Sequence, residues 1–324
     1  MTVLITGGAG YIGSNLARLL VKKKNKVCIV DNLSENNKLL IPKKAIFYNC
    51  NILNVKKIRK IIIKNKISSI FHLAAKIKVP ESETKPDKYF LNNFMGTIKL
   101  LEATKNTTVK KFIFSSTCAV YGNQTVVDEN SKINPTSVYG ETKYFAERYI
   151  DSFAKKNDLN YVILRYFNVC GSDTNLNHGQ VKKNGQLFKN LALESIKKQP
   201  KIKIYGDDFN TKDGTCERDY IHVSDISKIH FLSLKYLKSY NKNLLLNCGY
   251  GNSYSVKKIV SIFQKISGKK FNIQISKRRK GDVKSIRTQN SKLKKVLNFK
   301  PQYNNIDKIV KSCIDWEKKS NNVK

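Results

Sequence analysis

The chain has 324 residues, of which 40% are hydrophobic and 10% aromatic, and its formal net charge is +37. This composition excludes a disordered chain and predicts one or two globular domains. The charge suggests a nucleic-acid binder as one interpretation, but the lysines are spread along the whole chain instead of forming one basic tail. We therefore favour a generally lysine-rich composition without a nucleic-acid partner, whose positive field attracts small anionic ligands.

The cysteines and the apolar runs indicate the cellular setting. The seven cysteines are scattered, odd in number and without a C-x-x-C spacing, which predicts reduced thiols in a cytoplasmic protein and no metal site. The start of the chain, "MTVLITGGAG", lacks the pattern of a secretory signal. Apolar runs such as "KIIIKNK" are too short to cross a bilayer, so we expect no membrane partner.

Strands and helices alternate through the first half of the chain. In chain order we expect strands at residues 3–7, 26–31, 45–52, 69–75, 110–116 and 161–167, and helices at 12–23, 55–64, 86–105 and 137–156. Such alternation is typical of βαβ units, in which helices cover both faces of a parallel sheet. The predicted fold class is therefore α/β, with a Rossmann-like doubly wound parallel sheet.

The pattern loosens beyond residue 168. We expect a loop at 210–220, helices at 225–240, 255–266 and about 307–318, and a strand at 244–249. No internal repeat and no low-complexity linker is present. We therefore predict a nucleotide-binding Rossmann domain over 1–167 and a smaller α/β substrate-binding lobe mainly over 168–324, with some segments interleaved with the first domain.

A glycine-rich turn joins the first expected strand to the first expected helix. Gly7, Gly10 and Gly13 have the spacing G-x-x-G-x-x-G, which lets backbone N–H groups approach a pyrophosphate at the helix N-terminus. Asp31 ends the next strand, about twenty residues on, where a carboxylate accepts from ribose hydroxyls and repels a 2′-phosphate. The combination predicts NAD rather than NADP. A purely structural glycine turn is the less favoured alternative.

A tyrosine and a lysine four residues apart, Tyr139 and Lys143, lie at the start of an expected helix. The spacing alone decides nothing, because Tyr254 and Lys258 share it. Position distinguishes the first pair, which follows a strand ending in hydroxyls, "FIFSST", with Thr117 as the last residue. Residues four apart share one helical face, so we expect the Lys143 ammonium to lower the pKa of Tyr139 below its usual value of about 10.

These motifs occur with others in one order. "HLAA" at 72–75, "NN" at 92–93 and "FSSTCAVYG" at 114–122 lie between the glycine turn and the Tyr–Lys pair. Together they resemble the extended short-chain dehydrogenase/reductase family. In the second half, "RYFNVCG", "IYGDDFNTKDGTCERDYIHVSD", "NCGYGNSYSV" and "RRKGD" resemble its UDP-glucose 4-epimerase branch. The resemblance covers nearly the whole chain, and "DGT-x-x-RDYIHV" is its most branch-specific segment.

The resemblance implies NAD as cofactor and three catalytic residues. Tyr139 would be the base, Lys143 would hold the nicotinamide ribose, and the Thr117 hydroxyl would bridge to the substrate oxygen. The implied contacts of the cofactor are Gly7, Gly10, Tyr11, Ile12, Gly13, Asp31, Asn32, Asn51, Ile52, Leu73, Ala74, Ala75, Asn92, Ser115, Tyr139, Lys143 and Tyr166.

The resemblance also implies a UDP-sugar substrate and a homodimer. The implied contacts of the substrate are Thr117, Tyr139, Asn168, Arg218, Arg279 and Asp282. Each charged residue alone would suit a solvated surface, and their joint presence in the matching segments favours the binding role. Family dimers form through the helices expected here at 86–105 and 137–156. We expect His72 and His222 to be structural, because no metal-ligand spacing surrounds them.

The implied activity is epimerisation at C4 of a UDP-hexose, of the UDP-glucose/UDP-galactose type, through a 4-keto intermediate. Related dehydratases carry an Asp-Glu pair directly after the threonine, whereas Cys118 and Ala119 here do not form such an acid-base pair. A UDP-N-acetylhexosamine or UDP-uronate 4-epimerase of the same fold is the alternative. A catalytically inactive nucleotide sensor is disfavoured, because the Thr, Tyr and Lys are intact.

Several positions depart from the common pattern of the branch. Asn51 replaces the usual aspartate near the adenine, and Lys76 and Lys78 flank the position of a family lysine. Ile286 stands where side-chain bulk in the family helps to decide whether an N-acetyl group fits, and the segment 175–188 differs where the uracil and sugar are held. The identity of the sugar is therefore left open.

Overall fold

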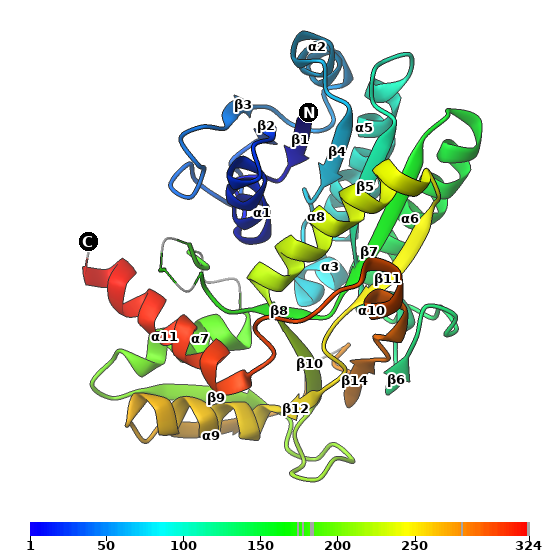
Figure 1. Cartoon of the computed structure of the whole chain (residues 1–324). Helices are drawn as coiled ribbons and strands as arrows, with labels where there is room; N and C mark the ends of the chain where they lie inside the picture. The colour runs from blue at the N-terminus through cyan, green and yellow to red at the C-terminus, as the bar shows by residue number, and fades with distance from the viewer. Residues whose placement is uncertain (174, 177, 182–184, 280, 323–324) are drawn as a thin grey trace.

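The computed structural model describes residues 1–173, 175–176, 178–181, 185–279 and 281–322 (Figure 1). Its largest element is a seven-stranded sheet in which every neighbouring pair of strands is parallel. The strand order is β11-β7-β5-β4-β1-β2-β3. The strands are β1 (Thr2–Thr6), β2 (Lys26–Asp31), β3 (Ile46–Asn49), β4 (Ser69–His72), β5 (Lys111–Thr117), β7 (Asn160–Tyr166) and β11 (Leu244–Cys248). The predicted doubly wound sheet is confirmed.

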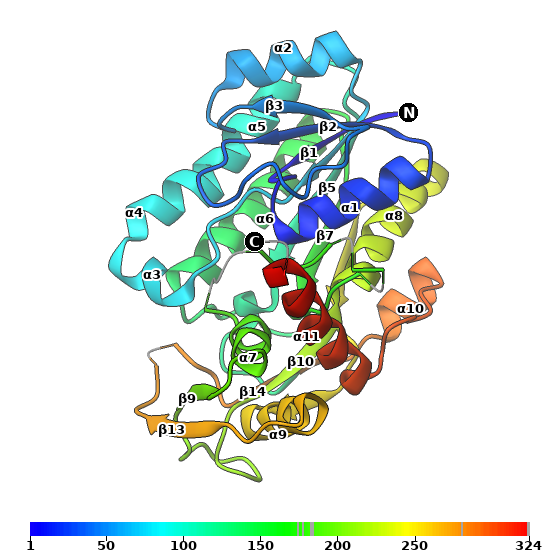
Figure 2. The ribbon, with the colours of Figure 1, turned by 90° about the vertical axis from the view of Figure 1, so that its left-hand side faces the viewer.

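Helices cover both faces of this sheet. They are α1 (Tyr11–Lys22), α2 (Val55–Asn65), α3 (Val79–Thr84), α4 (Pro86–Tyr89), α5 (Gly96–Thr104), α6 (Val138–Lys156) and α8 (Val223–Tyr240). Figure 2 shows α1 and α8 side by side on one face, and α2, α5 and α6 lie on the other. Because side chains alternate along a strand, Val3 and Ile5 pack in the core on the α1 side, whereas Leu4 packs in the core on the α2 side.

The smaller lobe contains two short sheets and further helices. One sheet has the order β12-β10-β14-β6, with β8 also paired to β10, and the other pairs β13 with β9. The strands are β6 (Val126–Val127), β8 (Asn168–Cys170), β9 (Lys201–Tyr205), β10 (Glu217–His222), β12 (Ser253–Ser255), β13 (Asn272–Ser276) and β14 (Ser285–Thr288). The helices are α7 (Leu187–Ser195), α9 (Val256–Ser267), α10 (Ser291–Leu297) and α11 (Ile306–Asn322).

Two expected elements were wrong in part. The loop expected at 210–220 ends in the strand β10, because residues 217–222 pair with three other strands that are distant in sequence. The single helix expected at 86–105 consists of α4, a π-helical segment at Phe90–Met95, and α5. Within that segment the Asn93 side chain exchanges hydrogen bonds of 2.8 and 3.0 Å with the backbone of Lys76, which ties the widened turn to the end of β4.

The chain passes more than once between the large sheet and the smaller lobe. After β10, it returns through α8 to β11, which pairs with β7 at the edge of the large sheet. The short strand β6 precedes residue 167 and pairs with β14 of the lobe. A division at residue 167 stays a prediction. Among the described residues, no helix has both the length and the apolar composition needed to cross a membrane.

Candidate active site

One cavity lies where the strands of the large sheet end. Parallel strands of a doubly wound sheet present their carboxyl ends at one edge, and ligands bind where the strand order reverses, here between β1 and β4. All predicted cofactor residues line this cavity: Gly7, Gly10, Tyr11, Ile12, Gly13, Asp31, Asn32, Asn51, Ile52, Leu73, Ala74, Ala75, Asn92, Ser115, Tyr139, Lys143 and Tyr166. The fold thus brings these residues to one cavity, although they come from segments far apart in the chain.

The glycine turn brings the backbone close to its neighbours. Gly7 has φ +71°, in the left-handed region, and a Cβ there would lie 2.6 Å from the backbone nitrogen of Ala74. A Cβ on Gly13 would lie 2.3 Å from the carbonyl oxygen of Gly7. Only glycine fits both positions. The turn leads into α1, whose free N–H groups and dipole suit a pyrophosphate, so the residues present fit a dinucleotide.

Asp31 is buried at the end of β2 and is already held by the backbone. Its carboxylate oxygens accept hydrogen bonds from the N–H groups of Ala9, at 3.1 Å, and Leu33, at 2.8 Å. Burial raises the pKa of Asp31, and these two hydrogen bonds oppose the shift. A carboxylate has about four acceptor positions, so Asp31 retains capacity for ribose hydroxyls. The side-chain oxygen of Asn51 accepts from the N–H of Leu53, at 3.0 Å.

Tyr139 lines the cavity, and Thr117 lies next to it outside the described lining. Tyr139 lies in the first turn of α6, and its hydroxyl is close enough to the Thr117 side chain, at the end of β5, to interact with it. Burial raises the pKa of Tyr139 to about 12, and the interaction with Thr117 opposes the shift. The expectation that Lys143 lowers this pKa was therefore wrong, because burial disfavours the charged phenolate and dominates the shift.

Lys143 is itself desolvated, which explains the weak effect on Tyr139. Its side chain is 3% exposed, and Nζ lies 4.1 Å from the centre of the Phe114 ring. Burial lowers the pKa of Lys143 to about 7, and the carboxylate of Glu147 opposes the shift. Lys143 therefore holds its proton much less strongly than an ordinary lysine.

A buried ion pair behind Lys143 was missed by sequence reasoning. The Arg165 guanidinium donates to both carboxylate oxygens of Glu147, and the shortest of these bonds is 2.6 Å. The Ser116 hydroxyl also donates to Glu147. The spacing of Lys143 and Glu147, one helical turn, was a local signal for this carboxylate, but Arg165 comes from β7 and no local pattern indicates it.

A short helix also missed by sequence reasoning, α3, fixes the start of α6. The Ser82 hydroxyl accepts from the N–H of Tyr139, at 3.1 Å, and the Glu83 carboxylate accepts from the N–H of Val138, at 2.9 Å. These groups satisfy helix N–H donors that have no partner inside the helix. The position of the Tyr139 backbone is therefore set by α3 as well as by α6.

The predicted substrate residues form a second group beside the cavity. Arg218 on β10 lies 3.8 Å from the Asp282 carboxylate, and Arg279 donates to the same carboxylate at 2.9 Å. Asn168 is exposed at the start of β8, which pairs with β10. Except for Tyr139, the predicted substrate residues are absent from the described lining of the cofactor cavity. Their convergence at β10 places positive charge and a carboxylate together.

Cys118 interacts with residues of both groups, namely Tyr139 in the cofactor cavity and Arg218 on β10. It directly follows Thr117 and contributes to the raised pKa of Tyr139. Burial raises the pKa of Cys118 itself to about 12, and the Arg218 charge opposes that shift. The thiol therefore stays protonated at neutral pH. The positive charge of Arg218 acts on Cys118, the residue that directly follows Thr117.

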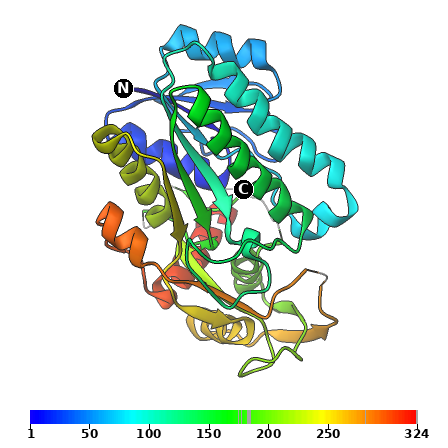
Figure 3. The same cartoon turned by 90° about the vertical axis from the view of Figure 1, so that its right-hand side faces the viewer.

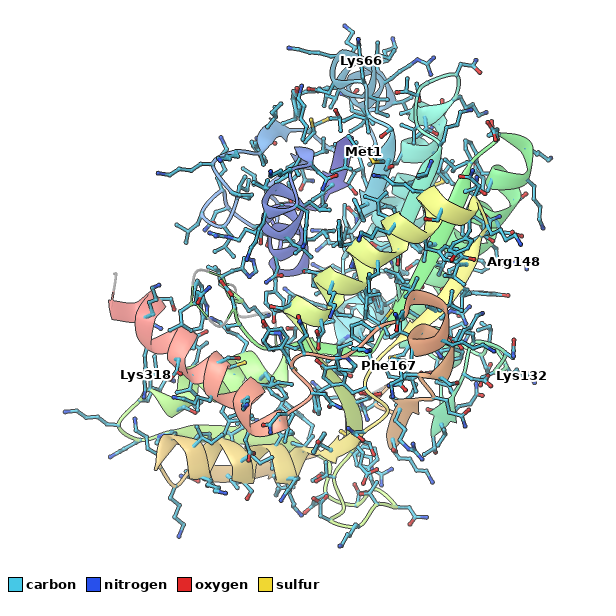
Figure 4. All side chains as sticks on the ribbon, in the orientation of Figure 1. Met1, Lys66, Lys132, Arg148, Phe167 and Lys318 are labelled. Atoms are coloured by element: carbon cyan, nitrogen blue, oxygen red, sulfur yellow. The ribbon has the colours of Figure 1, made fainter. Side chains whose placement is uncertain are left out.

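The two features that leave the sugar open are Ile286, which the structure describes, and the segment 175–188, which it describes in part. Ile286 is 3% exposed on β14, in register with Arg218, and packs in a cluster that includes Tyr121 and Phe167. Figure 4 labels Phe167 near the junction of the large sheet and the lobe. In the segment 175–188, residues 177 and 182–184 lie outside the described residues.

The described part of that segment reaches the cofactor cavity. Gln180 lines the cavity, and its carbonyl accepts from Lys189 Nζ, at 2.7 Å, and Trp316 Nε1, at 3.1 Å. Further lining residues that sequence reasoning did not assign to the cofactor are Val30, Ser34, Glu35, Asn36, Cys50, Lys76, Ile77, Lys78, Glu81, Ser116, Val169 and Gln186. Most come from loops after strands, where only a fold can show proximity.

Comparison with known proteins agrees with this geometry. Residues 3–249 match the model of the NAD dependent epimerase/dehydratase family. The chain belongs to this family. It is 37% identical to the UDP-glucose 4-epimerase of Lactobacillus helveticus, over 98% of this chain and 97% of that protein.

Solved structures give the same result. A crystal structure of a UDP-glucose 4-epimerase is 37% identical, with a TM-score of 0.94 and 99% of each chain covered. The UDP-Glc/GlcNAc 4-epimerase of Campylobacter jejuni is 38% identical, with a TM-score of 0.84 and 98% and 99% covered.

Proposed function

We propose that the protein epimerises C4 of a UDP-hexose, of the UDP-glucose/UDP-galactose type, with NAD as cofactor. The observation that carries the proposal is the interaction of Thr117 with Tyr139 beside the buried Lys143, where Tyr139 and Lys143 line the same cavity as the glycine turn. The similarity of the chain to UDP-glucose 4-epimerases over nearly its full length supports the same activity.

The chain's own residues provide acid-base chemistry at one hydroxyl. In the proposed cycle, Tyr139 takes the proton of the C4 hydroxyl while Thr117 holds the oxygen. Bound NAD supplies the acceptor for the C4 hydride that leaves with this proton, and the hydride returns to the opposite face of the 4-keto sugar, so that no net oxidation occurs. Lys143 stabilises the phenolate by its ammonium form and holds the nicotinamide ribose. The same Tyr139 returns the proton after the 4-keto sugar has turned over, so no further acid or base is needed.

The lobe supplies the proposed contacts of the nucleotide. A diphosphate suits bidentate arginines, and Arg218 and Arg279 converge on Asp282. We propose that the diphosphate takes over both guanidinium groups, which releases Asp282 for a ribose hydroxyl. Asn168 would bind the substrate from the start of β8. Thr117 and Tyr139 would contact the sugar.

The test is a coupled assay of UDP-galactose conversion, with Tyr139→Phe beside the parent. We expect the parent to be active and Tyr139→Phe to lose roughly 10³-fold in kcat, in line with the usual contribution of a general base. A nucleotide-loaded parent that converts neither UDP-galactose nor UDP-glucose would contradict the proposal. Tyr254→Phe, which removes the other tyrosine with a lysine four residues later, is the control and should retain activity.

A UDP-N-acetylhexosamine or UDP-uronate 4-epimerase is the second candidate. It is favoured by the similarity to the Campylobacter jejuni protein, which is named for both Glc and GlcNAc substrates. A panel of UDP-glucose, UDP-N-acetylglucosamine and UDP-glucuronate distinguishes the two, because kcat/KM should be highest for UDP-glucose under our proposal. A higher value for either of the other two sugars would replace it.

We further propose that the protein is a cytoplasmic homodimer. An exposed apolar patch is formed by α6 and the π-helical segment Phe90–Met95. It contains Leu91, Met95 and Phe145, which are 55%, 36% and 44% exposed. Phe90 and Phe94 lie against the Phe145 ring. Figure 3 shows the two helical segments side by side on the outer surface. An exposed patch of this kind favours a subunit interface, and Phe145→Asp should convert a dimer to a monomer in light scattering.

A further inference from the structure

A row of hydrogen-bonded side chains leads from the cofactor cavity into the core. Ser115 and Tyr166 line the cavity, and His230 on α8 has no exposed surface. Ser115 Oγ lies 2.7 Å from the Tyr166 hydroxyl, which lies 2.5 Å from His230 Nε2. His230 Nδ1 lies 2.8 Å from the carbonyl oxygen of Ile226. The row therefore connects a backbone group of α8 with the surface that a nucleotide would meet.

The carbonyl at the inner end fixes the direction of every hydrogen bond in the row. A carbonyl oxygen only accepts, so His230 Nδ1 carries the hydrogen and donates it to Ile226. Burial lowers the pKa of His230 to about 4, so the imidazole is neutral and Nε2 is an acceptor. Tyr166 must then donate its only hydrogen to Nε2. The Tyr166 oxygen therefore accepts the hydrogen bond that the Ser115 hydroxyl donates.

This order decides what Ser115 offers to a ligand. Its only hydrogen points to Tyr166, so toward the cavity it can only accept. In the part of the chain that the structure describes, the Ser115 and Tyr166 hydroxyls have no further hydrogen-bond partner. An acceptor that cannot rotate into a donor selects for a ligand with N–H or O–H groups at this point.

The position of Ser115 indicates which part of NAD it meets. Ser115 lines the same cavity as Tyr139 and Lys143, whereas Asn51 and Ile52 belong to the segment after β3, on the far side of the sheet order. The reacting nicotinamide must lie at the Tyr139 end, and its carboxamide is the donor group of that ring. We propose that His230 fixes Ser115 as a hydrogen-bond acceptor for the nicotinamide carboxamide, and that His230 is thus a positioning residue.

This inference rests on the proposed NAD cofactor, and dinucleotide binding tests it without relying on turnover. Calorimetric titration of the whole, nucleotide-free protein compares NAD⁺ with its 3-acetylpyridine analogue, in which a methyl ketone replaces the carboxamide and removes the N–H donors. We expect the parent to prefer NAD⁺ roughly tenfold, as for the loss of one well-placed hydrogen bond. His230→Leu removes the acceptor for Tyr166, so the preference should fall to about twofold or less. His230→Gln restores an acceptor and should recover part of the preference.

Two further variants separate this role from general damage. Ser233→Ala changes another buried residue of α8, whose hydroxyl donates to the carbonyl of Ile229 at 2.8 Å, and should keep the parent's preference. Tyr166→Phe breaks the row while retaining the ring, so it tests the inference even where His230→Leu does not fold. An unchanged preference in Tyr166→Phe, or an equal loss in Ser233→Ala, would overturn the inference. A parent that binds neither dinucleotide would overturn the NAD assignment and this inference with it.

Discussion

The Glu147–Arg165 pair and the Arg218–Asp282–Arg279 group both place opposite charges in contact, but in different surroundings. The side chains of Arg165 and Glu147 are 4% and 3% exposed, and the carboxylate accepts from Arg165 and Ser116. In the second group, Arg279 is 43% exposed, whereas Arg218 and Asp282 are 14% and 16% exposed and lie 3.8 Å apart, beyond hydrogen-bond distance. The first group is complete without a ligand, whereas the second has loosely held charges that a ligand can take over.

This difference has an energetic basis. A buried ion pair must recover the cost of removing two charges from water, and loss of one partner costs about 3–5 kcal/mol. The Arg279–Asp282 pair, with an exposed guanidinium, contributes only about 0–1 kcal/mol, and Arg218 makes no hydrogen bond to Asp282 across 3.8 Å, so exchanging these contacts for contacts with a diphosphate costs little. The molecule thus combines a buried ion pair of fixed geometry beside Lys143, the fixed side, with an arginine group that can exchange partners, the adaptable side. Substitutions on each side test this contrast.

The largest expected effect is on the fixed side. Glu147→Gln leaves the Arg165 guanidinium buried without its carboxylate, so we expect the free energy of unfolding to fall by about 4 kcal/mol, measured by urea denaturation. Glu102→Gln is the matched control, because its pair with Lys99 is 44% and 39% exposed and should cost less than about 0.5 kcal/mol. Equal losses in the two variants would remove the contrast.

Lys143 should destabilise the fold in a pH-dependent way. Its folded pKa of about 7 lies below the ordinary value of 10.5, so between these values the unfolded chain binds the proton more strongly and stability rises with pH. Lys143→Met removes a buried charge that is costly at and below pH 7. We expect the nucleotide-free variant to be roughly 3–5 kcal/mol more stable than the parent at pH 6, because a shift from 10.5 to about 7 corresponds to at most about 4.8 kcal/mol.

The same gain should shrink as the pH approaches 10, because Lys143 is then neutral in the folded parent and the unfolded chain is close to losing the same proton. Thermal denaturation from pH 6 to 10, with parent and variant in the same buffers, measures the gap. A gap that stays constant with pH would show that Lys143 has an ordinary pKa in the folded protein. The variant should have lost epimerase activity throughout.

A smaller effect is expected on the adaptable side. Arg218→Ala should raise KM for the UDP-sugar roughly 30-fold, or about 2 kcal/mol, the usual range for a hydrogen bond to a charged group. NAD affinity and the free energy of unfolding should be nearly unchanged. Arg148→Ala, at an exposed arginine that is labelled at the periphery of the molecule in Figure 4, is the control. A loss of stability as large as that of Glu147→Gln would refute the distinction.

The smallest effect is expected for Arg279→Ala. This guanidinium is exposed and lies 5.0 Å from the Tyr205 ring centre, so KM should rise only about threefold, below 1 kcal/mol. Raising the salt concentration should weaken substrate binding in the parent and reduce the difference between parent and variant. A larger effect than that of Arg218→Ala would reverse the order of the two arginines.

The sequence predicted the parts of this molecule that depend on neighbours in the chain. The strand ending at Asp31, the glycine turn and the helix that carries Tyr139 and Lys143 each show a local pattern, because periodicity and turn chemistry act over a few residues. The convergence of the proposed cofactor residues could also be expected, since strands of a parallel sheet end at one edge.

Features that depend on distant partners could not be predicted in the same way. β10 contains the polar run "ERDY", and it forms a strand because it pairs with β8, β12 and β14. The buried Asp219 carboxylate accepts from the N–H groups of Tyr250 and Gly251. Arg165 was assigned only to a strand, although its partner on α6 makes it part of the site. The pKa of Tyr139 depends on how far water is excluded, which residue spacing does not show.

The passage of the chain between the large sheet and the lobe has a consequence for how the protein assembles. The edge strand β11 can join β7 only after the chain has built β8 and β10, and β6 waits for β14, some 160 residues later. Neither half completes its hydrogen bonding during synthesis until the other has emerged. A ribosome-bound first half would thus expose the β7 edge, and folding should be slow, cooperative and dependent on protection of that edge.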